Sequence, residues 1–247
     1  MIKRFLTISM LAGFIHAAPD TGITMREGGI VRADACVLAM DFETGIADDL
    51  SGNENNGTIF GATHVPATKT VSGAFRLDGV NDYIRVSDID ETEGTNQLSV
   101  CCWVKCDIMP ADYPASGQGY VAKFDTGKSW ILYGNAGLTQ AQFRVYQGGA
   151  SYRAVGNSIL DKNWHHYCGI YNGANVILYD NGIEQPTKAV FTGNITIGNS
   201  YITIGSYQLS TDYFHGSIDE VLIYNYYLTP SEVNDLYRAG MIRHPNP

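Results

Sequence analysis

The segment that most constrains the fold is residues 214–240, where a dense apolar run leads directly into a helix-start signal. β-Branched and aromatic residues fill most of positions 218–226, which is typical of a strand buried on both faces. Residues 229–232 (TPSE) then supply a threonine cap, a proline for the first helical position and a glutamate that can close a capping box. The apolar spacing predicts a helix that ends at Gly240. A helix this short is marginal alone, so we expect it to pack on a sheet.

The rest of the chain consists of short strand patterns separated by turns. Apolar and β-branched residues cluster or alternate at residues 37–42, 98–106, 129–133, 142–146, 152–155, 164–171, 176–179, 183–185, 195–197 and 201–205. Asn181-Gly182, between two of these runs, is a strong hairpin signal. Residues 107–119 are predicted to form a long loop. Roughly a dozen strands with this spacing predict a single all-β sandwich.

Charge and cysteine content limit the partners and the compartment. The chain has 25 acidic and 16 basic residues, and its only basic pair is Lys3-Arg4, which argues against nucleic acid as a partner. The five cysteines include the adjacent pair Cys101-Cys102 and do not indicate a disulfide framework. They are typical of small core residues, and unpaired cysteines suit a reducing compartment.

The N-terminal residues are organised differently from the rest of the chain. Residues 1–18 have the order of a secretory signal peptide, with basic residues, an apolar run and Ala17-Ala18 at a candidate cleavage site. The alternative is a structural N-terminal arm. Residues 19–35 are predicted as a linker or arm, residues 36–240 as the domain, and residues 241–247 as a tail. Beyond a signal peptide, we expect no membrane-spanning segment.

Four segments resemble motifs of the laminin-G-like, concanavalin A-like jelly-roll family. They are residues 48–57 (DDLSGNENNG), 74–86 (AFRLDGVNDYIRV), 164–182 (WHHYCGIYNGANVILYDNG) and 216–237 (GSIDEVLIYNYYLTPSEVNDLY). The resemblance implies a jelly-roll sandwich of two antiparallel sheets with a short C-terminal helix. It is specific for fold and weak for function, because this fold carries many unrelated activities.

The residue patterns of enzymes with this fold are missing. Glycosidases that the chain resembles place carboxylates at alternate strand positions, so that they face one cleft. Residues 88–91 (DIDE) are instead predicted to form a solvated turn. Asp219 and Glu220 are adjacent, as are His165 and His166, so the members of each pair should face opposite sides of a strand. The lyase motifs of the fold are also absent, and we expect a non-catalytic protein.

A structural calcium ion is the candidate cofactor that the resemblance implies. In relatives, such an ion ties the final strand to the first loops through an aspartate at the position of Asp219. Asp219 is therefore the first candidate ligand, with Glu43 and Asn53 as weaker candidates, because calcium prefers several oxygen ligands. The alternative is that Asp219 is hydrogen-bonded to the loop at residues 51–57 without a metal.

Aromatic residues are the candidate ligand-binding groups. The chain has 16 tyrosines and 3 tryptophans, whose rings can stack on the apolar faces of sugars. The candidates are Tyr113, Tyr120, Trp130, Tyr146 and Tyr152. For each of them, plain packing within the sheets is the alternative.

Two functions remain open on the sequence alone. The first is a secreted or surface-displayed recognition and adhesion module that binds a glycan or a protein through one face of the jelly roll. The second is a virion structural protein, a capsid decoration or fibre subunit, whose arm at residues 1–35 docks on neighbouring subunits. A polysaccharide hydrolase or lyase is disfavoured because its motifs are absent.

Overall fold

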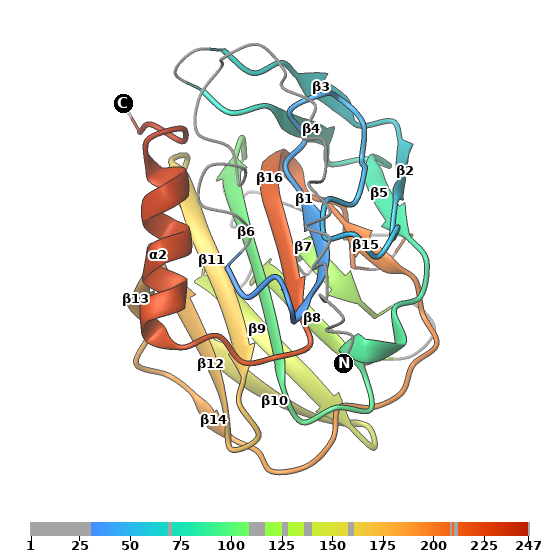
Figure 1. Ribbon diagram of the computed structural model, residues 1–247, viewed down its shortest axis with the longest axis vertical. Helices are drawn as coiled ribbons and strands as arrows, with labels where there is room; N and C mark the ends of the chain where they lie inside the picture. The colour runs from blue at the N-terminus through green and yellow to red at the C-terminus, as the bar shows by residue number, and fades with distance from the viewer. Residues whose placement is uncertain are drawn as a thin grey trace, which may run out of the picture.

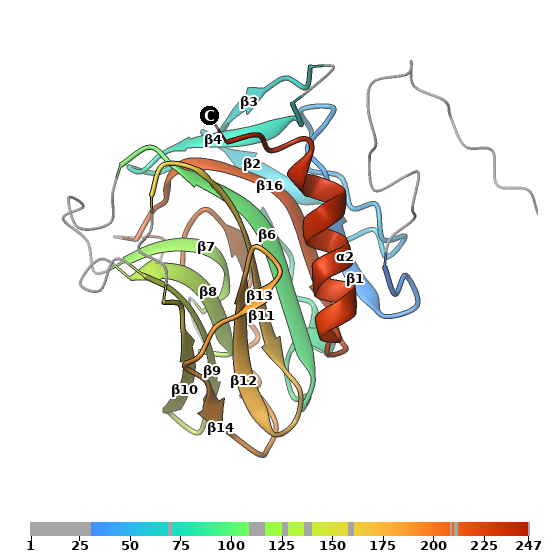
Figure 2. The same cartoon turned by 90° about the vertical axis from the view of Figure 1, so that its left-hand side faces the viewer.

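The computed structural model describes residues 31–68, 71–108, 117–124, 128–135, 140–157, 161–207, 209 and 212–246. The predicted signal peptide, most of the predicted arm and Tyr113 lie outside these residues. The described residues form two antiparallel sheets packed face to face, with one α-helix against the outside of the larger sheet (Figures 1 and 2). This confirms the all-β sandwich with a C-terminal helix. No helix among the described residues is long and apolar enough to cross a membrane.

The larger sheet has nine described strands and runs in the order β13-β12-β11-β6-β16-β4-β3, with β1 paired to β16 and β14 paired to β12. Its strands are β1 (Cys36–Met40), β3 (Thr63–Val65), β4 (Ala74–Asp78), β6 (Leu98–Cys106), β11 (Trp164–Tyr171), β12 (Asn175–Asp180), β13 (Ile183–Glu184), β14 (Ala189–Val190) and β16 (His215–Tyr224). The predicted central strand is β16, which pairs with β1, β4 and β6.

The smaller sheet has seven described strands in the order β10-β9-β8-β7-β15-β5-β2. They are β2 (Gly57–Phe60), β5 (Tyr83–Val86), β7 (Gly117–Lys123), β8 (Trp130–Asn135), β9 (Gln140–Gln147), β10 (Ala150–Val155) and β15 (Ile202–Ile204). A single turn of 3-10 helix, η1 (Asp90–Thr92), follows β5. The main hydrophobic core lies between the two sheets.

Helix α2 (Pro230–Met241) begins with the predicted capping box. The Glu232 amide donates to the Thr229 hydroxyl at 3.3 Å, and the Glu232 carboxylate accepts from the Thr229 amide at 2.7 Å. Gly240, however, lies inside the helix and does not end it. A Cβ on Gly240 would come within 2.3 Å of Trp103 Nε1, so this glycine allows α2 to approach the sheet closely.

Two strand predictions were wrong. Residues 195–197 form no strand, because Ile195 is buried while Ile197 is exposed in an irregular segment. In contrast, β7 begins at Gly117, inside the predicted loop. Gly119 is required there because a Cβ would lie 2.4 Å from the backbone nitrogen of Tyr207. Glycines in this role weaken the strand signal of the sequence.

The cysteine prediction also needs a correction. Cys101 on β6 and Cys168 on β11 are direct cross-strand partners, and they form a disulfide. The sequence does not show this pairing, since 67 residues separate the two positions. Cys36, Cys102 and Cys106 are free and buried, as expected for small core residues.

Candidate functional site

Two carboxylates of β16 lie in one buried cluster. The register between β16 and β6 shifts between Asp219 and Leu222, and Glu220 has φ +45°. This bulge breaks the alternation of the strand, so the prediction that Asp219 and Glu220 face opposite sides was wrong. Ligating atoms of Asp219, Glu220 and His244 all lie within 4.8 Å of one another, an arrangement that could hold a metal ion.

His244, which follows α2, makes two hydrogen bonds inside this cluster. Its Nδ1 lies 2.8 Å from the Gly240 carbonyl, which can only accept, so Nδ1 carries a proton. Its Nε2 lies 2.9 Å from Asp219 Oδ2. Burial raises the pKa of Asp219 well above its usual value and lowers the pKa of His244. Both shifts favour an uncharged pair in which the Asp219 carboxyl donates to Nε2.

A second part of the cluster surrounds Arg243. The Glu43 carboxylate accepts from the Ser72 hydroxyl at 2.8 Å and pairs with the Arg243 guanidinium, which also lies 3.7 Å from Glu220. Burial, together with the nearby Asp219, raises the pKa of Glu220 to about 8. Residues of the predicted tail are therefore packed into the domain.

The structure brings together two of the three predicted calcium ligands. Asp219 and Glu43 belong to the same cluster, linked through Ser72. Asn53 does not, because its amide donates at 3.0 Å to the carbonyl of Cys36, at the opposite end of β1 from the residues that pair near Asp219. The cation of this cluster comes from the protein itself, through Arg243, and His244 supplies a neutral hydrogen-bond partner for Asp219.

A second acidic cluster follows β5 and contains Asp88, Asp90 and Glu93. A lysine fills its centre. The side chain of Lys123 is completely buried, and its ammonium group pairs with Asp88, lies 3.1 Å from Glu93 and donates to the Ile89 carbonyl at 2.8 Å. Burial opposes ionisation of Glu93, but backbone donors and the ammonium group outweigh it and lower its pKa. The predicted solvated turn thus supplies Asp88 as the partner of a buried lysine.

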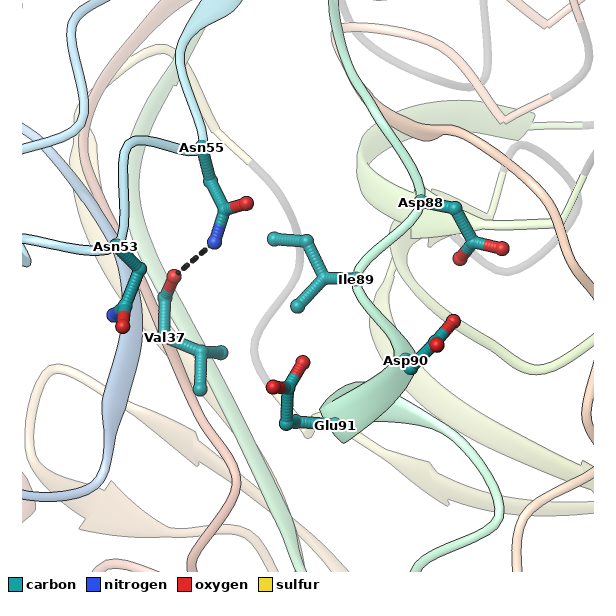
Figure 3. Close-up of a pocket in the computed structure, with 7 residues that line it drawn as sticks. All are labelled: Val37, Asn53, Asn55, Asp88, Ile89, Asp90 and Glu91. Carbon is teal, nitrogen blue, oxygen red and sulfur yellow. Dashed lines mark hydrogen bonds between the residues drawn. The ribbon is translucent and has the colours of Figure 1, made fainter.

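A shallow pocket of about 300 Å³ lies beside this cluster. Figure 3 shows Asn53 and Asn55 on one wall and residues 88–91 on the other. Ile89 and Glu91 point into the gap, whereas Asp88 and Asp90 point away from it. The Asn55 amide is bonded to the Val37 carbonyl at 2.8 Å. The pocket is polar, and its central carboxylate is Glu91.

The two adjacent histidines have different environments. His166 is buried against Trp103, and burial lowers its pKa to about 3, so it is neutral near pH 7. His165 lies 3.1 Å from Asp161 and 2.9 Å from Asp180. Burial opposes its protonation, but these carboxylates outweigh burial and raise its pKa. His166 is therefore a core residue packed on Trp103, and His165 is held by two carboxylates.

One row of cross-strand partners crosses all seven strands of the smaller sheet. From β2 to β10, the row consists of Thr58, Arg85, Thr203, Ala122, Ile131, Arg144 and Arg153. Sequence neighbours such as Ile84, Leu132 and Phe143 point into the core between the sheets. The row therefore faces away from the core. We call this side of the smaller sheet the outer face.

An accessible stack of rings and a guanidinium occupies one end of the outer face. The Arg85 guanidinium lies 5.0 Å from the Phe60 ring centre and 4.6 Å from that of Tyr201. The Phe60 ring also stacks on Tyr83 with 4.6 Å between centroids. Tyr201 is 48% exposed, and the other three side chains are half-buried. Aromatic faces next to a hydrogen-bond donor suit a sugar ring.

The middle of the outer face is covered. Tyr207, from the segment after β15, places its ring 5.4 Å from Phe124 and 5.7 Å from Tyr133. These rings form a small buried cluster with Ile131 and Tyr146. Beyond it, Arg144 is half-buried and Arg153 is exposed. The outer face therefore has two accessible ends.

The predicted aromatic candidates are mostly not on this surface. Tyr120 and Trp130 are fully buried in the main core, so their rings cannot receive a ligand. Tyr152 points inward and stacks on Phe191 at 4.3 Å. Tyr146 does lie on the outer face, but only 7% of it is exposed.

Sequence reasoning missed the accessible stack. Tyr83 and Arg85 alternate with the core residues Ile84 and Val86, a period-two signal that was available for the outward side of β5. The signal does not show that Phe60 and Tyr201 lie beside Arg85, because this depends on the pairing of β2 and β15 with β5.

Residues 78–234 match the family described as the concanavalin A-like lectin/glucanases superfamily. The match covers more than half of the chain, from the end of β4 into α2. The chain belongs to this family. The laminin-G-like, concanavalin A-like resemblance of the sequence motifs is thereby confirmed. No curated protein matches the chain.

Several solved structures share the fold. The binding domain of Paraclostridial Mosquitocidal Protein 1 is 19% identical with a TM-score of 0.67, over 83% of this chain and 52% of that one. Domain 4 of AbnA, an extracellular arabinanase from Geobacillus stearothermophilus solved with arabinotriose, is 22% identical with a TM-score of 0.63, over 82% and 98%. The ligand-binding domain of botulinum neurotoxin serotype D, solved with N-acetylneuraminic acid, is 14% identical with a TM-score of 0.65, over 83% and 51%. This chain thus spans about half the length of the first of these structures.

Proposed function

We propose that this protein is a non-catalytic glycan-binding module whose ligand lies on the outer face of the smaller sheet. The observation that carries the proposal is the accessible stack of Phe60, Arg85 and Tyr201. Its rings offer apolar faces for sugar C–H groups, and the guanidinium offers donors for sugar hydroxyls. Domain 4 of AbnA and the neurotoxin domain were solved with sugars, which supports a glycan as the class of ligand.

The composition of the smaller sheet supports a binding role over hydrolysis. A glycosidase places two carboxyl groups within about 5–9.5 Å of each other across the scissile bond. The seven described strands contain no aspartate or glutamate. The buried cluster at Asp219 lies on the other sheet and is closed by Arg243 and His244. No described strand of the proposed binding surface can therefore supply the acid and base.

An extracellular or surface location fits this function. The Cys101–Cys168 disulfide is a bond that persists in oxidising compartments. The arabinanase that contains the similar domain 4 is extracellular. The alternative of a virion subunit depended on unpaired cysteines and on an arm at residues 1–35. Because Cys101 and Cys168 form a disulfide, only three described cysteines are free, which weakens the argument from unpaired cysteines. Most of the arm lies outside the described residues.

Substitution of Tyr201 tests the proposed function. We expect full-length protein on an array of neutral and acidic glycans to bind at least one class, and Tyr201→Ala to weaken that binding about tenfold or more, because one face of the stack is lost. Tyr226→Ala is the matched control, since Tyr226 also stacks on an arginine, with Arg32 4.3 Å from its ring, but contacts the core on the helix side. Absence of binding to every glycan, or equal losses in both variants, would contradict the proposal.

The family resemblance also predicts a structural calcium ion at Asp219, but the described residues around Asp219 fit such an ion poorly. Calcium takes six to eight oxygen ligands, whereas Arg243 and His244 already bond the carboxylates here. We therefore expect the same melting temperature in millimolar calcium and in chelator. A drop on chelation that Asp219→Asn abolishes would instead establish the calcium site, because a metal bound only by the folded state raises stability.

A further inference from the structure

We infer that the Arg144–Arg153 end of the outer face binds an anionic group of the glycan, a carboxylate or a sulfate. This inference rests on the proposed function and names the class of glycan. Arg144 on β9 and Arg153 on β10 are direct cross-strand partners on the same side of the sheet. Like charges placed directly opposite each other on neighbouring strands are destabilising, and an anion bound between them would offset this repulsion.

The charge of this surface is opposite to that of the protein. The chain carries a net charge of −9. The seven strands of the smaller sheet nevertheless contain no acidic residue, and three arginines, Arg85, Arg144 and Arg153, lie on its outer face. The lysine of these strands, Lys123, is buried and already paired with carboxylates, so it adds nothing to this surface. Such an uncompensated positive surface attracts an anionic ligand and raises its rate of association.

Three arginines elsewhere in the described part of the fold are paired with carboxylates. Arg32 pairs with Asp34, Arg76 with Asp107, and Arg243 with Glu43 and Glu220. In the part of the chain that the structure describes, no ion pair joins Arg85, Arg144 or Arg153 to a carboxylate. Arg144 instead contacts neutral groups, namely the Tyr133 ring at 5.1 Å and the Gln142 amide oxygen at 2.9 Å.

A buried amide beside Arg144 adds an unpartnered donor. Gln142 is fully buried, and its Oε1 accepts from the Tyr133 hydroxyl at 2.8 Å and from Arg144. Its Nε2 has no hydrogen-bond partner. Buried donors are satisfied in most proteins, so an orphan donor requires an explanation. With both acceptor positions of Gln142 Oε1 used, Gln142 offers no free acceptor, and the charged groups that reach the surface at this end are Arg144 and Arg153.

Donors in this arrangement select for an anion. A planar guanidinium matches the paired oxygens of a carboxylate or a sulfate, and charge-assisted hydrogen bonds are about twice as strong as neutral ones. Arg85 and Arg144 lie four strands apart in the sheet, which is about 19 Å at about 4.8 Å per strand. An extended oligosaccharide can therefore stack at Arg85 and Tyr201 while one of its acidic groups reaches Arg144 and Arg153.

The test compares chemically matched acidic and neutral oligosaccharides on full-length protein by calorimetry. The probes are an oligogalacturonate with its carboxyl-reduced product, and a sulfated oligosaccharide with its desulfated product. We expect at least one acidic member to bind tenfold or more tightly than its neutral partner at low salt, and the difference to shrink at high salt. Comparison of the two pairs separates a carboxylate from a sulfate.

Two variants localise the effect. Arg153→Gln, at an exposed position, should lower the affinity for the acidic probe about tenfold and leave the affinity for its neutral partner unchanged. We expect the same result for Arg144→Gln. Arg238→Gln, in the last turn of α2 on the other sheet, is the charge-matched control and should change neither. Unchanged melting temperatures will show that each variant is folded.

The outcomes separate the two claims. If acidic and neutral probes bind equally, or if Arg153→Gln weakens both members of a pair to the same extent, the inference of an anionic ligand is overturned while glycan binding stands. If none of these probes binds although a neutral glycan of the array does, the inference is overturned while glycan binding stands. If no glycan of the array binds either, the proposed function itself fails. If Arg238→Gln and Arg153→Gln weaken binding of the acidic probe equally, the loss reflects overall charge alone. That result would overturn the assignment of the anion site to this end of the outer face.

Discussion

Replacement of Lys123 by methionine is expected to lower the free energy of unfolding by about 3–5 kcal/mol. The ammonium group is completely buried and contacts Asp88 and Glu93, of which Glu93 is 2% exposed. Methionine fills similar volume but leaves the Glu93 carboxylate buried without its cation. An unpaired buried charge is among the most destabilising single changes in a protein. Urea unfolding at pH 7 measures the loss.

Two further variants make this test specific. Lys128→Met makes the same substitution just before β8, the strand that pairs with β7, but Lys128 is exposed and its ammonium group lies 5.4 Å from the Phe124 ring. Lys128→Met is expected to change the free energy of unfolding by no more than about 0.5 kcal/mol. Adding Glu93→Gln to Lys123→Met should recover part of the stability, because the buried negative charge is then removed. A loss below 1 kcal/mol in Lys123→Met would show that the ammonium group is not the centre of this cluster.

Truncation of Trp103 to alanine should cost about 3–5 kcal/mol, the range found for large aromatic residues in cores. Trp103 is 2% exposed on the side of β6 that faces α2. Its ring stacks on His244 with centroids 4.2 Å apart and on Tyr237 of α2 at 5.8 Å. The cavity would therefore release both the helix and the segment that closes the Asp219 cluster. Urea unfolding again gives the magnitude.

Limited proteolysis gives an independent measure of the same change. We expect cleavage after Arg238 and Arg243 to become rapid in Trp103→Ala, because α2 loses the ring on which its C-terminal half packs. Tyr201→Ala removes an aromatic ring that is 48% exposed, so it should leave both stability and cleavage nearly unchanged. If Trp103→Ala is as resistant to protease as the parent protein, the ring does not anchor the C-terminal segment.

Much of the fold could be predicted from local pattern. β6 and β11 occupy the predicted residues 98–106 and 164–171, and the capping box at Thr229 is formed. These features are local, because a capping box needs four consecutive residues and a strand needs only its own run of β-branched and aromatic side chains. β7 was missed because its glycines serve contacts with other segments, which a propensity argument does not contain.

The candidate sites could be predicted only in part, because they depend on register. Asp219 and Glu43 do share a cluster, but the bulge at Glu220 that adds the second carboxylate is set by pairing with β6 and β1. Lys123 meets Asp88 across 35 positions of sequence, and nothing local to either residue indicates this. The row of arginines on the outer face likewise exists only once seven strands are in register.

The central claim is that the ligand contacts the outer face of the smaller sheet. The most direct measurement follows the Nε–Hε resonances of the arginine side chains by two-dimensional NMR while the full-length protein is titrated with the glycan that it binds best. The account predicts shifts for Arg85, Arg144 and Arg153 and none for Arg238 on α2. Shifts confined to Arg238 and Arg243 at saturating glycan would place the ligand on the helix side of the sandwich and contradict the account.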